Sequence, residues 1–205
     1  MKKIIFATGN AGKMREIRMI MADLGMEILS MKEAGVDIAI IEDGTTFAEN
    51  AVIKAKAVAD AYGRKNMEQE EVLILADDSG LEIDYLDKEP GVYSARYMGE
   101  DTSYHIKNQN LIDRLEGVSE EKRTARFVCA IAAVLSDGEV LTTRGTIEGR
   151  IGYEERGRNG FGYDPIFYVP AYQKSTAELS DEEKNAVSHR GNALRAMKQE
   201  LGKKR

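Results

Sequence analysis

The sequence predicts an α/β fold built on a mixed β-sheet, and two observations support this. In the first half, short apolar runs typical of buried strands alternate with segments whose apolar residues recur at helical spacing. In the second half, residues 126–135 and 140–148 read as strands joined at Ser136-Asp137-Gly138, a sequence typical of a hairpin turn. Because crossover units and a hairpin occur in one chain, a mixed sheet is favoured over a purely parallel one.

The first expected elements are a strand over residues 3–7 and a helix over residues 13–24. The stretch from there through Asp43 is expected to be rich in loops. A second helix is expected to start near Thr46, because Thr46 and Glu49 have the spacing of a capping box.

The middle of the chain continues this alternation. Residues 68–71 are acidic and predict a solvated loop, whereas residues 72–76 predict a buried strand. Residues 81–85 alternate between apolar and acidic side chains, as in a half-buried strand. Residues 104–115 predict a helix, and another helix is expected at the C-terminus after a short apolar run at 166–169.

The composition of the chain excludes several classes of function. The chain has 205 residues, of which 42% are hydrophobic, enough for one sizeable core or two closely joined lobes. A formal net charge of −6 argues against non-specific nucleic-acid binding. Cys129 is the only cysteine, which excludes an intramolecular disulfide and a Cys-rich zinc site and predicts a buried structural thiol. The N-terminal apolar run is too short for a signal peptide or membrane span, so a soluble cytoplasmic protein is expected.

The stretch FATGNAGK, from Phe6 to Lys13, has the parts of a phosphate-binding loop between a strand and a helix. It is not a P-loop, because that pattern requires glycine where the chain has Ala7 and a hydroxyl where it has Met14. If phosphate binds here, Lys13 and backbone N–H groups hold it. Any metal ligand must then come from another part of the chain.

Carboxylates are the candidates for that ligand. Asp77 and Asp78 are adjacent, and like charges this close repel unless a cation or proton intervenes. Taken alone, however, Asp77-Asp78-Ser79-Gly80 favours a simple turn. Glu42 has no evident structural role, whereas Glu49 is explained by the capping box. Two or three carboxylates together with substrate phosphates are normal oxygen ligands for Mg²⁺.

Two further segments have the residue types of an anion or base site. Ser188-His189-Arg190 places positive charge at the start of the last helix, where the macrodipole disfavours it unless an anion binds. The alternative is that these basic side chains are exposed and screened by the acidic residues 181–183.

Residues 161–165, FGYDP, offer a ring that can stack on a base and a carboxylate that can accept its N–H. The alternative is a turn that anchors Phe161 in the core.

Together these segments resemble one family closely, the inosine/xanthosine triphosphate pyrophosphatases, or Ham1-like family. The matching stretches follow the family's order over nearly the whole chain: residues 8–13, 46–51, 54–55, 76–81, 90–97, 161–167, 177–179, 183–185 and 188–190.

The resemblance implies one family domain over residues 1–205, with an elongated mixed sheet flanked by helices and two lobes around a central substrate cleft. It implies a homodimer that hydrolyses ITP, dITP and XTP, with Mg²⁺, to the monophosphate and pyrophosphate. Such an activity removes deaminated purines from the nucleotide pool.

The resemblance also implies roles for individual residues. The triphosphate would be bound by Thr8, Gly9, Asn10, Ala11, Gly12 and Lys13. Mg²⁺ would be held by Glu42 and Asp78, with Asp78 also activating water, and Ser79 would touch the substrate. The base would be held by Phe161, Gly162, Tyr163 and Asp164, with Lys184, His189 and Arg190 completing the pocket.

Alternatives from other classes stay open at this point. One is a sensor that binds modified purine nucleotides without cleaving them, and another is a pyrophosphatase for modified pyrimidine triphosphates. A nucleic-acid-binding protein is a weaker third, given the acidic balance. The sequence also leaves open whether Glu49 or Asp77 contributes to a metal site, and it gives His105 no role beyond that of an ordinary helix residue.

Overall fold

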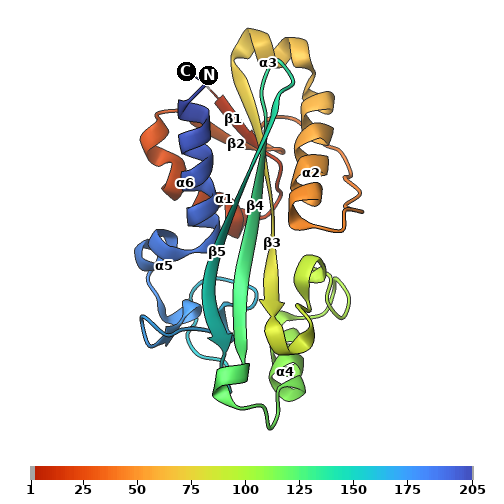
Figure 1. The fold of residues 1–205 in the computed structure, drawn as a ribbon. Coiled ribbons are helices and arrows are strands. Elements are labelled where there is room, and N and C mark those ends of the chain that lie inside the picture. The colour runs from red at the N-terminus through yellow and green to blue at the C-terminus, as the bar shows by residue number, and fades with distance from the viewer. Residues whose placement is uncertain (1–2, 205) are drawn as a thin grey trace. The chain divides into compact units, whose positions relative to one another are not determined.

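The computed structural model describes residues 3–204 and has the predicted mixed α/β fold. Within these residues, seven strands form one sheet in the order β2-β1-β3-β4-β5-β6-β7 (Figure 1). The strands are β1 (Lys3–Phe6), β2 (Glu27–Ser30), β3 (Val72–Ile83), β4 (Thr124–Val134), β5 (Val140–Ile151), β6 (Phe167–Val169) and β7 (Lys174–Ser175). The sheet is mixed because β1 pairs in parallel with β2 and β3, whereas β6 pairs antiparallel with both β5 and β7.

The α-helices of the described residues are α1 (Ala11–Met21), α2 (Phe47–Tyr62), α3 (Arg64–Glu70), α4 (Tyr104–Arg114), α5 (Asp181–Val187) and α6 (His189–Gly202). Within residues 3–204, no helix combines the length and the apolar character that crossing a membrane would require.

The chain divides into two compact units, neither of which is one continuous segment. Unit 1 comprises residues 3–78, 129–145 and 190–204 of the described chain, and unit 2 comprises residues 79–128 and 146–189.

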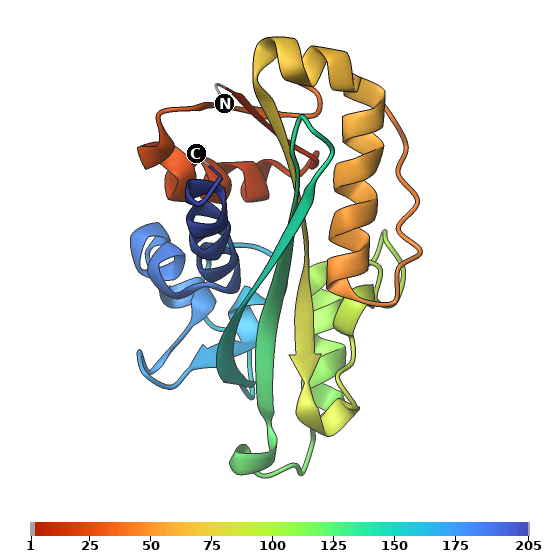
Figure 2. The same cartoon turned by 45° about the horizontal axis from the view of Figure 1, so that its top comes forward.

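Unit 1 has helices on both faces of its part of the sheet. α1 and α6 lie on one side of the strands and α2 on the other (Figure 2). The core beneath α1 and α6 is formed by the apolar residues Ile4, Phe6, Ile17, Leu73, Leu75, Ile131, Leu194 and Met197, all fully buried. Cys129 belongs to this core and is fully buried, as the sequence predicts.

Unit 2 has a separate core, formed by Leu111 of α4 and Leu115 directly after that helix, together with apolar residues of β3, β4 and β5. Tyr163 and Ile166, from the segment before β6, belong to the same core. The segment that contains FGYDP is therefore anchored by its tyrosine, whereas Phe161 stays about a third exposed.

Several predicted elements are confirmed. α2 begins directly after Thr46, and Thr46 and Glu49 form the capping box in both directions. The helix predicted at 104–115 is α4, and the hairpin at 136–138 joins β4 to β5. α1 starts at Ala11, two residues before the predicted start, because the Asn10 side chain accepts a hydrogen bond from the Lys13 backbone N–H.

Two predictions are wrong, and one strand was not expected. The stretch through Asp43 is rich in loops, as predicted, but it also contains β2, a short strand that pairs with β1 although its residues are only partly buried. The predicted loop at 68–71 falls largely within α3, which buries only Met67. Residues 77–80 are not a turn, because β3 continues through them to Ile83.

Candidate functional site

In unit 1, the segment between β1 and α1 presents backbone N–H groups at the start of a helix. Thr8 is half-buried, whereas Gly9, Asn10 and Ala11 are exposed. Asn10 caps α1, and the Lys13 side chain lies in the first turn, where the helix dipole favours an anion. This geometry suits a phosphate group.

A buried ion-pair network lies next to this helix start. Asp77 is 1% exposed, and its Oδ1 lies 3.1 Å from Nζ of Lys13, while its Oδ2 lies 3.0 Å from Nη2 of Arg190. Arg190 also forms an ion pair with Glu16 of α1. Asp77 therefore holds two cations that come from opposite ends of the chain.

The charge state of Asp77 follows from these contacts. Burial by itself raises the pKa of a carboxyl group, but the charges of Lys13, Arg190 and Lys54 outweigh it and hold the pKa of Asp77 well below its ordinary value. Asp77 is thus an anion whose oxygens already face cations. This argues against it as a ligand for a metal ion and explains why it sits beside Asp78 without repulsion.

Asp78 points to a different set of partners. Its Oδ2 accepts a hydrogen bond of 3.1 Å from Nδ2 of Asn50, and its Oδ1 lies 3.4 Å from Nζ of Lys54. The same Lys54 nitrogen lies 2.6 Å from Oε2 of Glu42. The two predicted metal ligands, Glu42 and Asp78, are therefore close enough to share one cation, and in this structure that cation is the lysine ammonium.

These residues fit a divalent ion by their donor chemistry. Burial raises the pKa of Asp78 above its ordinary value, and the opposing effects of the Lys54 charge and the Asn50 hydrogen bond do not fully offset it. Within residues 3–204, no group of three or more acidic, histidine or cysteine side chains forms a complete protein cage for a metal. Two carboxylates completed by substrate phosphates and water are the usual arrangement for Mg²⁺.

Glu49 lies outside this arrangement. Its Oε2 accepts hydrogen bonds of 2.8 and 3.1 Å from the backbone N–H groups of Thr45 and Thr46. The hydrogen bond from the Thr45 hydroxyl, at 2.8 Å, and these backbone hydrogen bonds lower the pKa of Glu49. Its role as the helix cap therefore accounts for its position.

In unit 2, three of the predicted base-site residues meet in one pocket. Asp164, Lys184 and His189 line a narrow hollow. The other lining residues are Phe127, Ile147, Thr176, Val187 and Ser188. The His189 ring stacks on Phe127 with the ring centroids 4.9 Å apart, so an aromatic pair forms one wall.

Asp164 organises the loop around this pocket, residues 160–164. Its Oδ2 accepts from Nζ of Lys184 at 2.7 Å and from the backbone N–H of Phe161 at 2.8 Å. Its Oδ1 accepts from the Thr176 hydroxyl at 2.9 Å. With three donors already bound, Asp164 has little capacity left for a base N–H, and its main contribution is to hold Lys184 and the loop in place.

Phe161 is the exposed aromatic group at this site. Its ring is 37% exposed, and Nζ of Lys184 lies 5.1 Å from the ring centroid. A partly exposed ring beside a buried ammonium is suited to stacking on a planar base.

The alternative interpretation of the basic C-terminal residues is wrong. Lys184, His189 and Arg190 are each less than 9% exposed, so they are not solvated side chains screened by acidic neighbours. α6 begins at His189, as predicted. Lys184 and His189 lie in unit 2, and Arg190 lies in unit 1 with Asp77.

Sequence reasoning gave no role to Asn50, Lys54 or Thr176, and it left open whether Asp77 contributes to a metal site. A signal for two of them exists in the sequence. Asn50 and Lys54 are four residues apart on the apolar face of α2, where both are buried next to Ala51 and Ala55. Polar residues inside a buried helical stripe indicate a partner across the interface, which here is Asp78.

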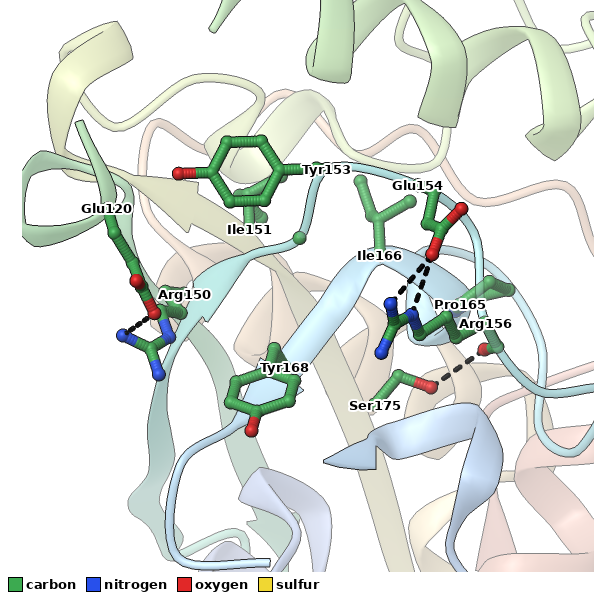
Figure 3. Close-up of a pocket in the computed structure, with 11 residues that line it drawn as sticks. Glu120, Arg150, Ile151, Tyr153, Glu154, Arg156, Pro165, Ile166, Tyr168 and Ser175 are labelled. Atoms are coloured by element: carbon green, nitrogen blue, oxygen red, sulfur yellow. Dashed lines mark hydrogen bonds and ion pairs between the residues drawn. The ribbon is translucent and has the colours of Figure 1, made fainter. Parts of the chain in front are cut away.

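A second, larger hollow in unit 2, of about 170 Å³, contains no predicted site residue (Figure 3). The rings of Tyr153 and Tyr168 flank it, with Ile151 and Ile166 between them. Its charged groups already have partners, since Arg150 pairs with Glu120 and Arg156 with Glu154. The hollow therefore offers no free charge to a ligand.

Comparison with known proteins identifies the same family as the sequence motifs do. The sequence profile of the Ham1 family matches residues 4–200. The chain is 45% identical over 201 residues to a dITP/XTP pyrophosphatase of Clostridium perfringens, covering 98% of each chain, and 48% identical over 199 residues to one of Exiguobacterium sp., covering 97% and 96%. The solved structure of the Staphylococcus aureus Ham1 protein superposes with a TM-score of 0.85 at 39% identity and full coverage of both chains. By profile, sequence and fold, the chain belongs to the Ham1 family.

Proposed function

We propose that the protein hydrolyses ITP, dITP and XTP to the nucleoside monophosphate and pyrophosphate, using Mg²⁺, and so removes deaminated purines from the nucleotide pool. Its relatives named dITP/XTP pyrophosphatases, 45–48% identical over nearly the full length, support this substrate class. The observation that best supports metal-dependent hydrolysis is the pair of carboxylates Glu42 and Asp78, bridged by Lys54. Both units would serve the reaction as one functional domain.

The triphosphate would be bound in unit 1 by residues 8–13. The start of α1 offers backbone N–H groups, and Lys13 offers an ammonium. The position of Lys13 is fixed by Asp77, which is in turn held by Arg190. Arg190 would add a second positive charge next to Asp77.

Glu42 and Asp78 would hold Mg²⁺. A bound Mg²⁺ neutralises charge on the departing pyrophosphate and makes a nearby water more acidic. In the reaction, a water oxygen forms a bond to the α-phosphorus, and the bond from that phosphorus to the bridging oxygen breaks. Asp78 would orient the attacking water by accepting its hydrogen bond, while Lys54 balances the charge of both carboxylates.

The base would be read in unit 2. The 6-oxo group of hypoxanthine or xanthine is an acceptor, which suits the ammonium of Lys184, whereas adenine presents a donor at the same position. Phe161 would stack on the base, Gly162 and Tyr163 would shape the loop, and His189 would line the pocket. Ser79, the half-buried residue after Asp78, would touch the substrate.

The proposed setting of the enzyme is a cytoplasmic homodimer that acts on free nucleotides and not on nucleic acid or membranes. The net charge of −6 supports the absence of a nucleic-acid partner.

The test is to incubate the purified protein with ITP and Mg²⁺, with ATP and GTP in parallel, and to identify the phosphorus-containing products. Release of IMP and pyrophosphate from ITP, with ATP and GTP largely spared, is the expected result. Release of IDP and orthophosphate would contradict the proposed bond cleavage. Tight ITP binding without any product would favour the sensor alternative.

A further inference from the structure

The 160–164 loop depends on contacts that come from elsewhere in unit 2. It has no strand of its own, and Gly160 and Gly162 adopt φ values of +74° and +69°, which side chains rarely tolerate. Tyr163 is anchored by its hydroxyl, which donates to the carbonyl of Ser94 at 2.7 Å. The loop contains most of the proposed base-binding residues. The contacts that fix its conformation therefore affect how the protein binds the base.

Helix α4 supplies two of these contacts. The ring of Tyr104 meets the ring of Tyr163 edge-on, with centroids 5.2 Å apart. Nδ2 of Asn108, one turn later on the helix, donates to the carbonyl oxygen of Gly162 at 3.3 Å. Asn108 is thus the polar link between α4 and the backbone of the loop.

Glu155 fixes the orientation of the Asn108 side-chain amide. Its Oε1 accepts a hydrogen bond of 2.6 Å from the same Nδ2 of Asn108, and its Oε2 lies 2.7 Å from Nδ1 of His105. His105 and Asn108 are three residues apart and share one face of α4. Glu155 therefore binds two side chains of the helix at once, and His105 is more than an ordinary helix residue.

The orientation of the Asn108 amide is unambiguous. Both partners of Nδ2 are oxygen acceptors, so only the NH₂ group can occupy that position. Oδ1 of Asn108 is consequently buried and has no hydrogen-bond partner among the described residues. A buried acceptor without a partner destabilises the fold, and its presence here indicates that the contact with Gly162 is retained for another reason.

We propose that Asn108, oriented by Glu155, is a positioning residue that holds the 160–164 loop in the conformation that binds the purine base. This proposal rests on the proposed function, because the base is the ligand assigned to the loop. Asn108 and Glu155 would therefore affect the affinity for the base without touching the nucleotide. They would have no part in the reaction at phosphorus.

The test compares Asn108→Ala and Glu155→Ala with Asn110→Ala as the matched control. Asn110 lies on the same helix, but its Oδ1 accepts from the Tyr97 hydroxyl. Glu155→Gln is the conservative variant, because a glutamine oxygen can still accept from Asn108.

Removing Asn108 or Glu155 is expected to raise the KM for ITP about tenfold, as expected for the loss of one buried hydrogen bond, with kcat changed much less. Inhibition by IMP, which carries the base, should weaken by the same factor, whereas inhibition by pyrophosphate should not change. Asn110→Ala and Glu155→Gln should stay near the wild-type values. Equal weakening of IMP and pyrophosphate inhibition, or an unchanged KM in a folded variant, would overturn the proposal.

Hydrogen exchange separates this proposal from the proposed function. The backbone amides of residues 161–164 should exchange faster in Asn108→Ala and Glu155→Ala than in Asn110→Ala, whatever the substrate is. If the wild-type protein releases no pyrophosphate from ITP, the proposed function fails, and this exchange measurement alone decides whether Asn108 positions the loop. Unchanged exchange at these amides would overturn the positioning role.

Discussion

The guanidinium of Arg190 donates two hydrogen bonds to Oδ2 of Asp77, from Nε at 3.2 Å and from Nη2 at 3.0 Å, across 113 residues of sequence. Both side chains are at most 2% exposed. This ion pair joins the start of α6 to β3 in unit 1, and through Asp77 it reaches Lys13 at the start of α1. Three segments of the proposed phosphate site therefore depend on one carboxylate.

Asp77→Asn is expected to lower the free energy of unfolding by about 3 to 5 kcal/mol, because it leaves Arg190 and Lys13 without their shared anion. Urea unfolding followed by circular dichroism measures this. Asp23→Asn is the control, since the Asp23 side chain is 71% exposed and pairs with Lys198 at the surface, where an ion pair contributes little to stability. An Asp77→Asn protein with the wild-type urea midpoint would contradict this account of the network.

Asp78→Asn is expected to reduce kcat for ITP by about 10² or more, because the neutral amide cannot hold the cation as a carboxylate does and is a weaker acceptor for the attacking water. The variant should fold, since the amide oxygen can still accept from Asn50. Steady-state pyrophosphate release at increasing Mg²⁺ measures both effects, and half-saturation should move to higher Mg²⁺. Asp43→Asn, an exposed neighbour of Glu42, should behave as wild type. Near-normal turnover in Asp78→Asn would exclude an essential role.

Lys184→Met is expected to reduce the preference for ITP over ATP. The ammonium is the proposed donor to the 6-oxo group, and a stranded buried hydrogen-bonding group can discriminate by about 10⁴. Ratios of kcat/KM for the two nucleotides measure the change, with the exposed Lys174→Met as the control. A ratio equal to that of the wild type would show that base selection resides elsewhere.

Gly160→Ala and Gly117→Ala form a matched pair, because both glycines have φ of +74°. A methyl group at position 160 would lie 2.1 Å from Oδ2 of Asp164, whereas at position 117 nothing lies within 4 Å. Both substitutions introduce the same backbone strain, of order 1 kcal/mol. Only Gly160→Ala should also raise the KM for ITP, by about tenfold or more. Similar kinetics in the two variants would show that the contact between Asp164 and the loop does not matter for binding.

Asp84 should contribute measurably to the dependence of the free energy of unfolding on pH. Burial alone would raise its pKa, but hydrogen bonds from Lys88, Thr124 and Arg126 outweigh this and lower it to about 2. In the unfolded chain the pKa is higher, so the unfolded state binds more protons between about pH 4 and pH 2. The stabilising contribution is therefore complete above pH 4 and is lost as the pH falls towards 2.

Asp84→Asn should consequently flatten the change in the urea midpoint between pH 2 and 4 relative to wild type. The exposed Asp60→Asn serves as the control. A wild-type slope in Asp84→Asn would contradict the assignment.

Much of the fold was predictable because local signals and tertiary contacts agree. The capping box at Thr46 and the periodic apolar residues of α1 and α2 specify helices without help from the rest of the chain. β2 was missed because it lies at the edge of the sheet and is only partly buried, so its residues lack a clear apolar pattern. α3 was missed because it buries a single residue and its other residues are polar or charged.

The stretch from Asp77 to Gly80 shows where local preference is overridden. Its residue types favour a turn, yet the backbone stays extended as part of β3. Asp77 is held by Lys13 and Arg190, and Asp78 by Asn50 and Lys54, all of which are remote in sequence. The same long-range contacts explain why the residue types of the candidate site were predictable but their pairing was not.

The single cysteine of the chain has a practical consequence. Cys129 is completely buried in the core of unit 1, and burial raises the pKa of its thiol, so the reactive thiolate is suppressed in the folded state. A thiol reagent should therefore react with the protein only when that core opens, and the rate of labelling becomes a probe of opening that needs no engineered reporter. For the same reason, a cysteine introduced at a surface position should take a fluorophore or spin label alone, with Cys129 left in place.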